Sequence, residues 1–317
     1  MQSNQKLIIG TRGSQLALWQ ANEVKRLLEE AHADQNLSIE LRIFHTRGDH
    51  ILDRPLAEVG GKGLFTKELE DALILGEIHL AVHSLKDMPT ELPKGLILGA
   101  IPNRADVRDV LIFRRGEAVD DLKVIGTSSL RRAALAQRKW PQAQIVSIRG
   151  NVPTRMNRVF DEGDRRVDAV LLALAGIVRL KLNQDEKFDY LPLNPDKWIP
   201  AASQGALAIE CREDDHWVRH LLSPLHQEKV SQCILAERAF LRAVEGDCRV
   251  PVGASATVDL GNMRIKGFVS SPDGKEYLEQ TMYIEDFQNP EQIGIDLAKS
   301  LLSMGGKEIL EALRSQV

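Results

Sequence analysis

The sequence has little of what marks secreted, membrane or disulfide-stabilised proteins. It has 317 residues but three cysteines, Cys211, Cys233 and Cys248, which are widely spaced and form no CxxC or Cys/His ligand pattern. No stretch approaches about 18 consecutive apolar residues, and the N-terminal segment lacks the apolar run of a signal sequence. We therefore expect a soluble, cytoplasmic protein with free thiols and no membrane partner.

An excess of positive charge is also absent. The 41 Lys and Arg residues are outnumbered by 45 Asp and Glu residues, for a formal net charge of −4. The molecule as a whole therefore has no attraction for nucleic acid, and an anion site requires a local cluster of basic residues. HExxH and other ligand spacings are missing, so no metal site is expected. The "GGKG" stretch lacks the spacing of a phosphate-binding P-loop.

What is present is an alternation of strand and helix patterns. An apolar run, "LIIGT", precedes a segment over residues 14–31 whose apolar residues share one helical face. Residues 37–44 then alternate as in a half-buried strand, a helix is expected from about Leu64 to Leu75, and "IHLAV" forms the next strand. This order predicts a parallel or mixed sheet with helices on both faces.

Three short segments recur in the same order in the second part of the sequence. "IIGTRGS" at 8–14 matches "VIGTSSL" at 124–130, "IFHTRGD" at 43–49 matches "IVSIRGN" at 145–151, and "IHLAVHS" at 78–84 matches "VDAVLLA" at 167–173. The repeat predicts two related α/β lobes. Because ligands of open α/β sheets bind beyond the carboxyl ends of the strands, we expect the lobes to face a cleft there.

The last part of the chain has a different pattern. A helix over residues 230–244 is followed by three strand segments, with an Asp-Gly turn at Asp273 and Gly274, and by two helices. This predicts a small C-terminal α+β domain. The proline-rich segment before "ALAIECRE" is expected to return the chain to the first lobe. The expected boundaries are 1–102 with 203–222 for domain 1, 106–199 for domain 2 and 227–317 for domain 3.

Basic residues gather at the predicted strand ends. They are Arg12, Arg47, Lys86, Arg131, Arg132, Arg149 and Arg155, with Lys62 in the glycine-rich loop. A strand end that leads into a helix presents free N–H groups, and added arginines make a strong carboxylate or phosphate site. Taken singly, such residues are commonly solvated surface charges. Their repeated position favours a polyanionic ligand.

Asp87 and the histidine and cysteine residues have more than one interpretation. Asp87 follows a buried strand, where a carboxylate can cap a turn or act as a general acid/base or stabiliser of a developing cation. His83 is expected to be a satisfied polar residue at a strand end. Cys211 and Cys233 fall at apolar positions and are expected in the core. Cys248, in "EGDCRVPVG", has no histidine base that the sequence identifies.

Several motifs together resemble the porphobilinogen deaminase family over nearly the whole chain. They are "GTRGSQLALWQA" (10–21), "TRGD" (46–49), "GGKGLFTKELE" (60–70), "AVHSLKDMPT" (81–90), "GTSSLRRAA" (126–134), "RGNVPTR" (149–155), "SQGALAIECR" (203–212) and "EGDCRVPVG" (245–253). The resemblance implies two lobes like those of periplasmic binding proteins plus a third domain. It also implies an enzyme, expected to be a monomer, that condenses four porphobilinogen molecules head to tail with loss of ammonia.

The resemblance further implies a cofactor and the roles of individual residues. A dipyrromethane primer would be joined by a thioether to Cys248, and Asp87 would stabilise the cationic azafulvene-like species formed as ammonia leaves. The residues that match cofactor-binding positions are Lys86, Ser84, Thr127, Ser129, Arg131 and Arg132. Those that match substrate-binding positions are Arg12, Ser14, Arg149, Asn151, Arg155 and Arg179. Lys62 and Phe65 match a lid.

Three positions depart from the family pattern. Asp247 stands beside Cys248 where glycine is usual, Glu58 replaces a lysine of some relatives, and Ser203 stands where glycine is frequent. An alternative to the enzyme is a non-catalytic two-lobe binding protein for a polycarboxylate. A nucleic-acid regulator that uses "SSLRRAALAQRK" as a basic helix is disfavoured by the net acidity.

Overall fold

The computed structural model describes residues 5–46, 48, 63–163, 166–244 and 250–314. The chain forms two compact units, residues 1–105 with 205–231 and residues 106–204 with 232–317. Over these described residues, no helix combines the length and the apolar character needed to cross a membrane.

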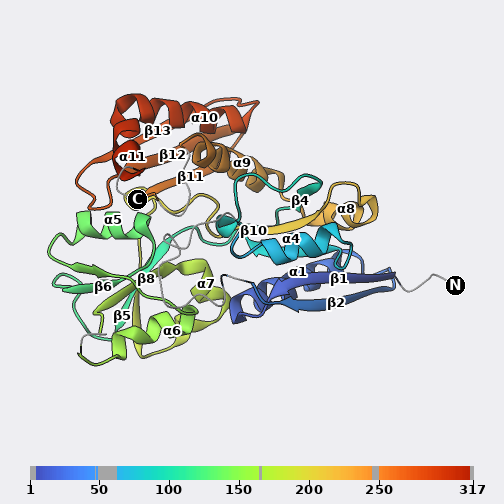
Figure 1. Cartoon of the computed structure of the whole chain (residues 1–317), viewed down its shortest axis with the longest axis horizontal. Helices are drawn as coiled ribbons and strands as arrows, with labels where there is room; N and C mark the ends of the chain where they lie inside the picture. Colours follow the sequence, from blue (N-terminus) through green and yellow to red (C-terminus); the bar gives the residue numbers. More distant parts are fainter. Residues whose placement is uncertain (1–4, 47, 49–62, 164–165, 245–249, 315–317) are drawn as a thin grey trace. The chain divides into compact units, whose positions relative to one another are not determined.

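The first unit is built on a five-stranded mixed sheet with the order β2-β1-β3-β10-β4 (Figure 1). Strands β2, β1 and β3 are parallel, and β10 runs antiparallel to both β3 and β4. The strands are β1 (Gln5–Arg12), β2 (Leu37–Phe44), β3 (Leu80–Ser84), β4 (Leu96–Ala100) and β10 (Leu207–Arg212), and the helices are α1 (Gln15–Ala31), α4 (Lys67–Ile74) and α8 (His216–Leu222).

Helices cover both faces of this sheet, as the alternation of strand and helix patterns predicted. Val24 and Leu28 of α1 pack with Leu7 and Ile9 of β1 in one buried cluster, whereas α4 contributes to a second cluster with Ala81 of β3. The helix expected from Leu64 begins at Lys67 instead. The preceding residues 63–66 form a turn, since Gly63 has a φ of +80°.

The second unit contains a five-stranded sheet of the same design, with the order β7-β6-β8-β5-β9. Strands β7, β6 and β8 are parallel, and β5 is antiparallel to β8 and β9. The strands are β5 (Asp109–Arg114), β6 (Val124–Gly126), β7 (Gln144–Val146), β8 (Ala169–Ala173) and β9 (Phe188–Pro192), and the helices are α5 (Leu130–Lys139), α6 (Val152–Met156) and α7 (Leu174–Arg179). The three sequence repeats fall on β1 and β6, β2 and β7, and β3 and β8, so they reflect a structural duplication.

The antiparallel strand of each sheet is the first strand after the chain changes units. β5 follows the passage at 105/106, and β10 follows the passage at 204/205. A strand that enters a sheet this way has no crossover helix to make it parallel. The mixed sheets are therefore a consequence of how the chain is shared between the units.

A three-stranded antiparallel sheet, β11-β12-β13, completes the second unit. Its elements are β11 (Val252–Asp259), β12 (Asn262–Ser270), β13 (Tyr277–Ile284), α9 (Glu228–Ala243), α10 (Pro290–Leu301) and α11 (Lys307–Arg314). The expected Asp-Gly turn connects β12 and β13, and Gly274 has a φ of +70°. Phe268 of β12 is buried in the core of the five-stranded sheet of this unit. The division into three domains stays a prediction.

Two of the cysteines lie where the sequence predicted. Cys211 in β10 is fully buried, and Cys233 in α9 is buried in the core of the C-terminal layer. Burial raises the pKa of the Cys211 thiol to about 11. Such a thiol is unreactive at neutral pH.

Candidate functional site

In the first unit, the predicted site residues lie at the ends of two neighbouring strands. Arg12 is the last residue of β1, and Ser84 is the last residue of β3. Lys86 and Asp87 follow at once in a short 3-10 turn, Leu85–Asp87. Because β1 and β3 are parallel neighbours, their carboxyl ends share one edge of the sheet. Ser14 caps α1 there, with its Oγ accepting from the N–H of Ala17 at 3.2 Å.

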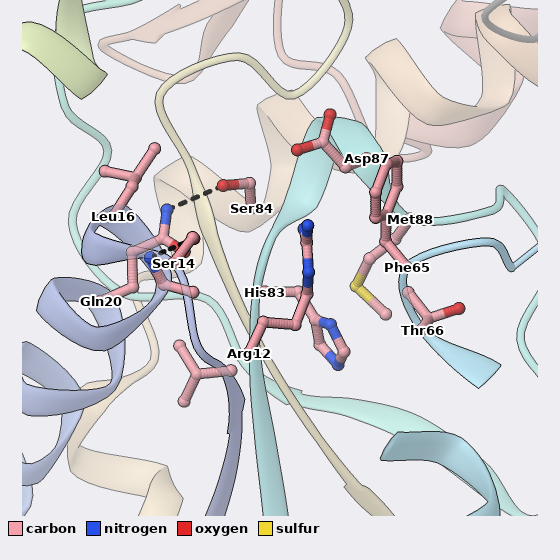
Figure 2. A pocket seen from close by; sticks show the side chains of 12 residues that line it. Arg12, Ser14, Leu16, Gln20, Phe65, Thr66, His83, Ser84, Asp87 and Met88 are labelled. Carbon is pink, nitrogen blue, oxygen red and sulfur yellow. Dashed lines mark hydrogen bonds between the residues drawn. The ribbon is translucent and has the colours of Figure 1, made fainter. Parts of the chain in front are cut away.

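A pocket of about 80 Å³ is lined by Arg12, Ser14, Ser84 and Asp87 but not by Lys86 (Figure 2). The side-chain amide of Gln20, a residue that the sequence did not single out, donates to Ser84 Oγ at 2.7 Å. Asp87 is exposed to solvent, and its carboxylate belongs to the same pocket as Arg12. The pocket therefore offers an anion, a cation and hydroxyl groups to a small polar ligand.

Phe65 is fixed on one side of this pocket. The guanidinium carbon of Arg12 lies 4.3 Å from the centre of the Phe65 ring, which is a cation–π distance. Gly48 of the "TRGD" motif packs on the same ring, since a Cβ at this position would lie 2.2 Å from it. The motif glycine is thus required for the approach of Phe65. Arg47, Glu58 and Lys62 lie outside the described residues.

A buried acidic group lies next to the pocket. His83 is a satisfied polar residue, as expected, with its Nε2 3.0 Å from Oε2 of the fully buried Glu210. Glu70 of α4 is also buried. Burial, and secondarily the neighbouring Glu210, raise the pKa of Glu70 above its ordinary value.

In the second unit, two arginines occupy the first turn of α5, directly after β6. Ser129 caps this helix, and Thr127 Oγ1 accepts from the N–H of Ser129 at 3.2 Å. Arg131 and Arg132 follow, with exposed fractions of 4% and 7%. They are not the solvated surface charges that arginines commonly are.

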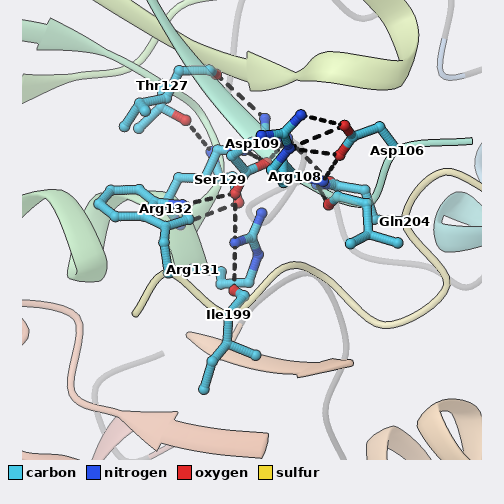
Figure 3. A network of polar contacts seen from close by, with 12 residues as sticks. Asp106, Arg108, Asp109, Thr127, Ser129, Arg131, Arg132, Ile199 and Gln204 are labelled. Carbon is cyan, nitrogen blue, oxygen red and sulfur yellow. Dashed lines mark hydrogen bonds and ion pairs between the residues drawn. The ribbon is translucent and has the colours of Figure 1, made fainter. Parts of the chain in front are cut away.

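Both guanidinium groups bind the carboxylate of Asp109, the first residue of β5 (Figure 3). Arg131 Nη1 lies 2.7 Å from Oδ2, and Arg132 Nη2 lies 2.8 Å from Oδ1. Burial alone would raise the pKa of Asp109, but the two adjacent positive charges outweigh it and hold this pKa well below its ordinary value. The cluster of two cations and one anion keeps one net positive charge.

The geometry of Arg131 fits a ligand carboxylate. Its Nη1 is occupied by Asp109 and by the carbonyl of Ile199, at 2.9 Å. Its Nε is buried and has no acceptor in the described part of the chain. The edge formed by Nε and Nη2 is the one that pairs with a carboxylate through two parallel hydrogen bonds.

The remaining predicted basic residues lie at the end of β7 and at the following helices. Arg149 and Arg179 are half-buried, and Arg155 donates from Nε to the carbonyl of Gly150 at 2.6 Å. Asn151 caps α6, with Oδ1 accepting from the N–H of Thr154 at 2.9 Å. Gly150 has a φ of +113°, so the glycine of "RGN" is required by the backbone.

Cys248 and Asp247 lie outside the described residues, but the strand after them is placed. Gly253 of β11 belongs to the same unit as Arg131, and a Cβ on it would lie 2.6 Å from the carbonyl of Pro200 and 3.1 Å from Cδ of Arg131. The absence of a side chain lets β11 pack against the arginine cluster. The chain is therefore fixed beside Arg131 five residues after Cys248.

The structure thus groups the predicted residues into two sets, one in each unit. It also adds three residues that the sequence analysis missed: Asp109, which binds the two arginines, and Trp198 and Gln204, which both donate to Asp109. The fold and these sets define an α/β protein with two mixed sheets whose basic residues gather at the strand ends.

The comparisons with known proteins specify the family. A profile described as "Porphobilinogen deaminase, dipyromethane cofactor binding domain" matches residues 7–220, and one described as "Porphobilinogen deaminase, C-terminal domain" matches residues 231–303. Relatives named porphobilinogen deaminase include those of Staphylococcus carnosus (42% identity, 98% of this chain and 99% of the relative), Chlorobium phaeobacteroides (45%, 98% and 98%) and Syntrophotalea carbinolica (46%, 98% and 97%). The chain belongs to the porphobilinogen deaminase family, whose members are transferases.

Proposed function

We propose that this chain performs its family's reaction with Cys248 as the attachment point of a dipyrromethane primer and Asp87 as the catalytic carboxylate. The reaction condenses four porphobilinogen molecules head to tail, releases ammonia at each addition and yields hydroxymethylbilane. The observation that supports the proposal most directly is the pair of strand-end sets, one with Asp87 beside Arg12 and one with the buried arginines. A cytoplasmic monomer with three domains is part of the proposal.

The primer, when bound, supplies the pyrrole acceptor on which the chain of pyrroles grows. Arg131 and Arg132 would hold its carboxylates, because their cluster carries an unbalanced positive charge and the buried Nε of Arg131 has no acceptor among the described residues. Thr127, Ser129, Ser84 and Lys86 would add hydroxyl and ammonium donors. The fixed position of Gly253 supports attachment through the thioether at Cys248, since it holds the following strand next to Arg131.

Asp87 would act by charge. Its carboxylate is exposed in the pocket, where it can accept from a pyrrole N–H and stabilise the cation that develops on the substrate as ammonia leaves. A fixed anion favours that charge more in the transition state than in the ground state.

The other basic residues would bind the acetate and propionate groups of the incoming porphobilinogen. Arg12 and Ser14 would do so in the first unit, and Arg149, Asn151, Arg155 and Arg179 in the second. Ser14 and Asn151 already accept from helix N–H groups, so each would contact the substrate through its own hydroxyl or amide hydrogen. Phe65 and Lys62 would form a lid over the bound substrate.

A mass measurement under denaturing conditions tests the tether. The wild-type chain should be heavier than its sequence by one dipyrromethane, and Cys248→Ala should have the mass of the sequence alone. Cys233→Ala is the matched control, because Cys233 is buried in the core, and it should keep the added mass.

Two outcomes decide between the enzyme and the alternative of a polycarboxylate-binding protein. An unmodified wild-type chain with full activity would refute the tether. A wild-type chain that binds porphobilinogen and releases no ammonia would favour the binding protein.

A further inference from the structure

We infer that Asp109 is a positioning residue for the primer site: it fixes Arg131 and Arg132 so that the free edge of Arg131 meets a ligand carboxylate. The inference rests on the proposed function, in which these arginines hold the dipyrromethane. It concerns a residue that would contact neither substrate nor primer.

The carboxylate of Asp109 is saturated by protein donors. Oδ1 accepts from Arg132 Nε at 2.9 Å and from Gln204 Nε2 at 2.9 Å, in addition to the ion pair with Arg132 Nη2. Oδ2 accepts from Trp198 Nε1 at 2.8 Å and pairs with Arg131 Nη1. Asp109 is also fully buried. Its oxygens have no position left for a ligand, so its influence on a ligand must pass through the arginines.

The two arginines are each held by a second acceptor. Arg131 Nη1 also donates to the carbonyl of Ile199, and Arg132 Nη2 donates to Gln204 Oε1 at 3.2 Å. A guanidinium is planar, so two acceptors on one side fix the direction of the opposite edge. For Arg131 that edge includes the buried Nε, which has no acceptor among the residues that the structure describes. Asp109 is thus the residue that both arginines share and that fixes their relative geometry.

Trp198 and Gln204 in turn fix Asp109. Both come from the segment that follows β9, and Trp198 is buried against Trp140 with ring centres 6.0 Å apart. Gln204 Nε2 donates to the carbonyl of Val107 at 2.8 Å as well as to Asp109. The carboxylate therefore cannot rotate without breaking hydrogen bonds inside the protein.

The test compares Asp109→Asn with Asp106→Asn in full-length protein. Asp109→Asn keeps the shape and removes the charge that balances one of two adjacent guanidinium groups. Asp106 lies three residues earlier, is exposed and pairs with Arg108, so its variant is the matched control. We expect Asp109→Asn to be recovered with less of the dipyrromethane mass, and its primer-loaded fraction to show kcat reduced by about tenfold or more. KM for porphobilinogen should change little, because the proposed substrate-binding arginines are untouched.

A second variant is needed in case Asp109→Asn does not fold. Trp198→Phe removes the hydrogen bond to Oδ2 and keeps an aromatic ring against Trp140. It should show a smaller loss of kcat in the same direction. A purely structural role of Asp109 predicts the opposite: a lower melting temperature with full primer mass and unchanged kcat in the folded fraction.

The controls separate this inference from the proposed function. If the wild type lacks the added mass, the tether itself is wrong. If the wild type carries the mass, and Asp109→Asn or, where that variant does not fold, Trp198→Phe has normal primer content and normal kcat, then Asp109 is not a positioning residue although the tether stands.

Discussion

Ser203 holds a backbone conformation that favours glycine, and replacing it should stabilise the second unit. Its φ is +64°, in the left-handed region, and its side chain is 1% exposed. The left-handed conformation costs a residue with a Cβ roughly 1–2 kcal/mol. The buried Oγ of Ser203 has no hydrogen-bond partner among the described residues, and leaving a buried hydroxyl unsatisfied costs about 1–3 kcal/mol. The conformation persists because Glu237 Oε2 accepts from the N–H of Ser203 at 2.6 Å.

Ser203→Gly removes both penalties and keeps the N–H that Glu237 binds. The greater freedom of glycine in the unfolded chain offsets roughly 0.5–1 kcal/mol of the gain. A net stabilisation of about 1 kcal/mol or more remains. For a body of 150–250 residues, each kcal/mol raises the melting temperature by about 2–4 °C.

The melting temperatures of the wild type, Ser203→Gly and Ser203→Ala test this prediction. Ser203→Ala removes the unpaired hydroxyl but retains the strained φ, so its melting temperature should lie below that of Ser203→Gly. The difference between the melting temperatures of the two variants measures the cost of the left-handed backbone conformation. Ser203→Gly is expected to melt above both the wild type and Ser203→Ala. If it does not, the strain argument is refuted.

Two further predictions concern the first unit. Asp87→Asn should fold and carry the primer mass but turn over about 10²–10³-fold more slowly, because it loses one electrostatic stabiliser of the developing cation. The exposed Glu91→Gln is the control in a steady-state assay. Near-normal condensation rates of Asp87→Asn relative to this control would contradict the catalytic role. Glu70→Gln should change the pH dependence of stability. The folded pKa of Glu70 is raised above its ordinary 4.5, so the stabilisation by the protonated side chain is fully present below pH 4.5 and is lost as pH rises through the folded pKa. The melting temperature of the variant relative to that of the wild type should thus increase as pH rises above 4.5, and a constant difference would exclude the effect.

The fold could be read from the sequence largely because its signals are local. Period-2 alternation gave the strand over 37–44, and the three repeats indicated two equivalent sheets that share strand order. The start of α4 was misplaced by three residues, because the turn at 63–66 has apolar residues that continue the helical pattern. The antiparallel strands β5 and β10 could not be assigned a direction, since their partners are distant in sequence.

The candidate site was predictable only as a set of charges. Basic residues at strand ends pointed to Arg12, Arg131 and Arg132, because a strand end that leads into a helix is a recurring anion site. Their partner Asp109 opens a buried strand, where a carboxylate has no distinctive spacing from the arginines it binds. Asp109 and the arginines are 22 or more residues apart in the chain, so their ion pairs cannot be predicted from sequence spacing. They are seen only in the structure, where β5 packs against β8.

One acidic residue for two arginines is the ratio that makes this cluster selective. Arg131 and Arg132 bring two positive charges into a nearly solvent-free position, and an unpaired buried cation is strongly unfavourable. Asp109 balances one charge and orients both side chains, which leaves one charge to favour a ligand carboxylate. A second acid would neutralise the cluster and remove its preference for anions, whereas no acid would leave two guanidinium groups repelling each other. In the proposed function, a protein with net charge −4 would bind a polycarboxylate here because positive charge is concentrated at this buried position.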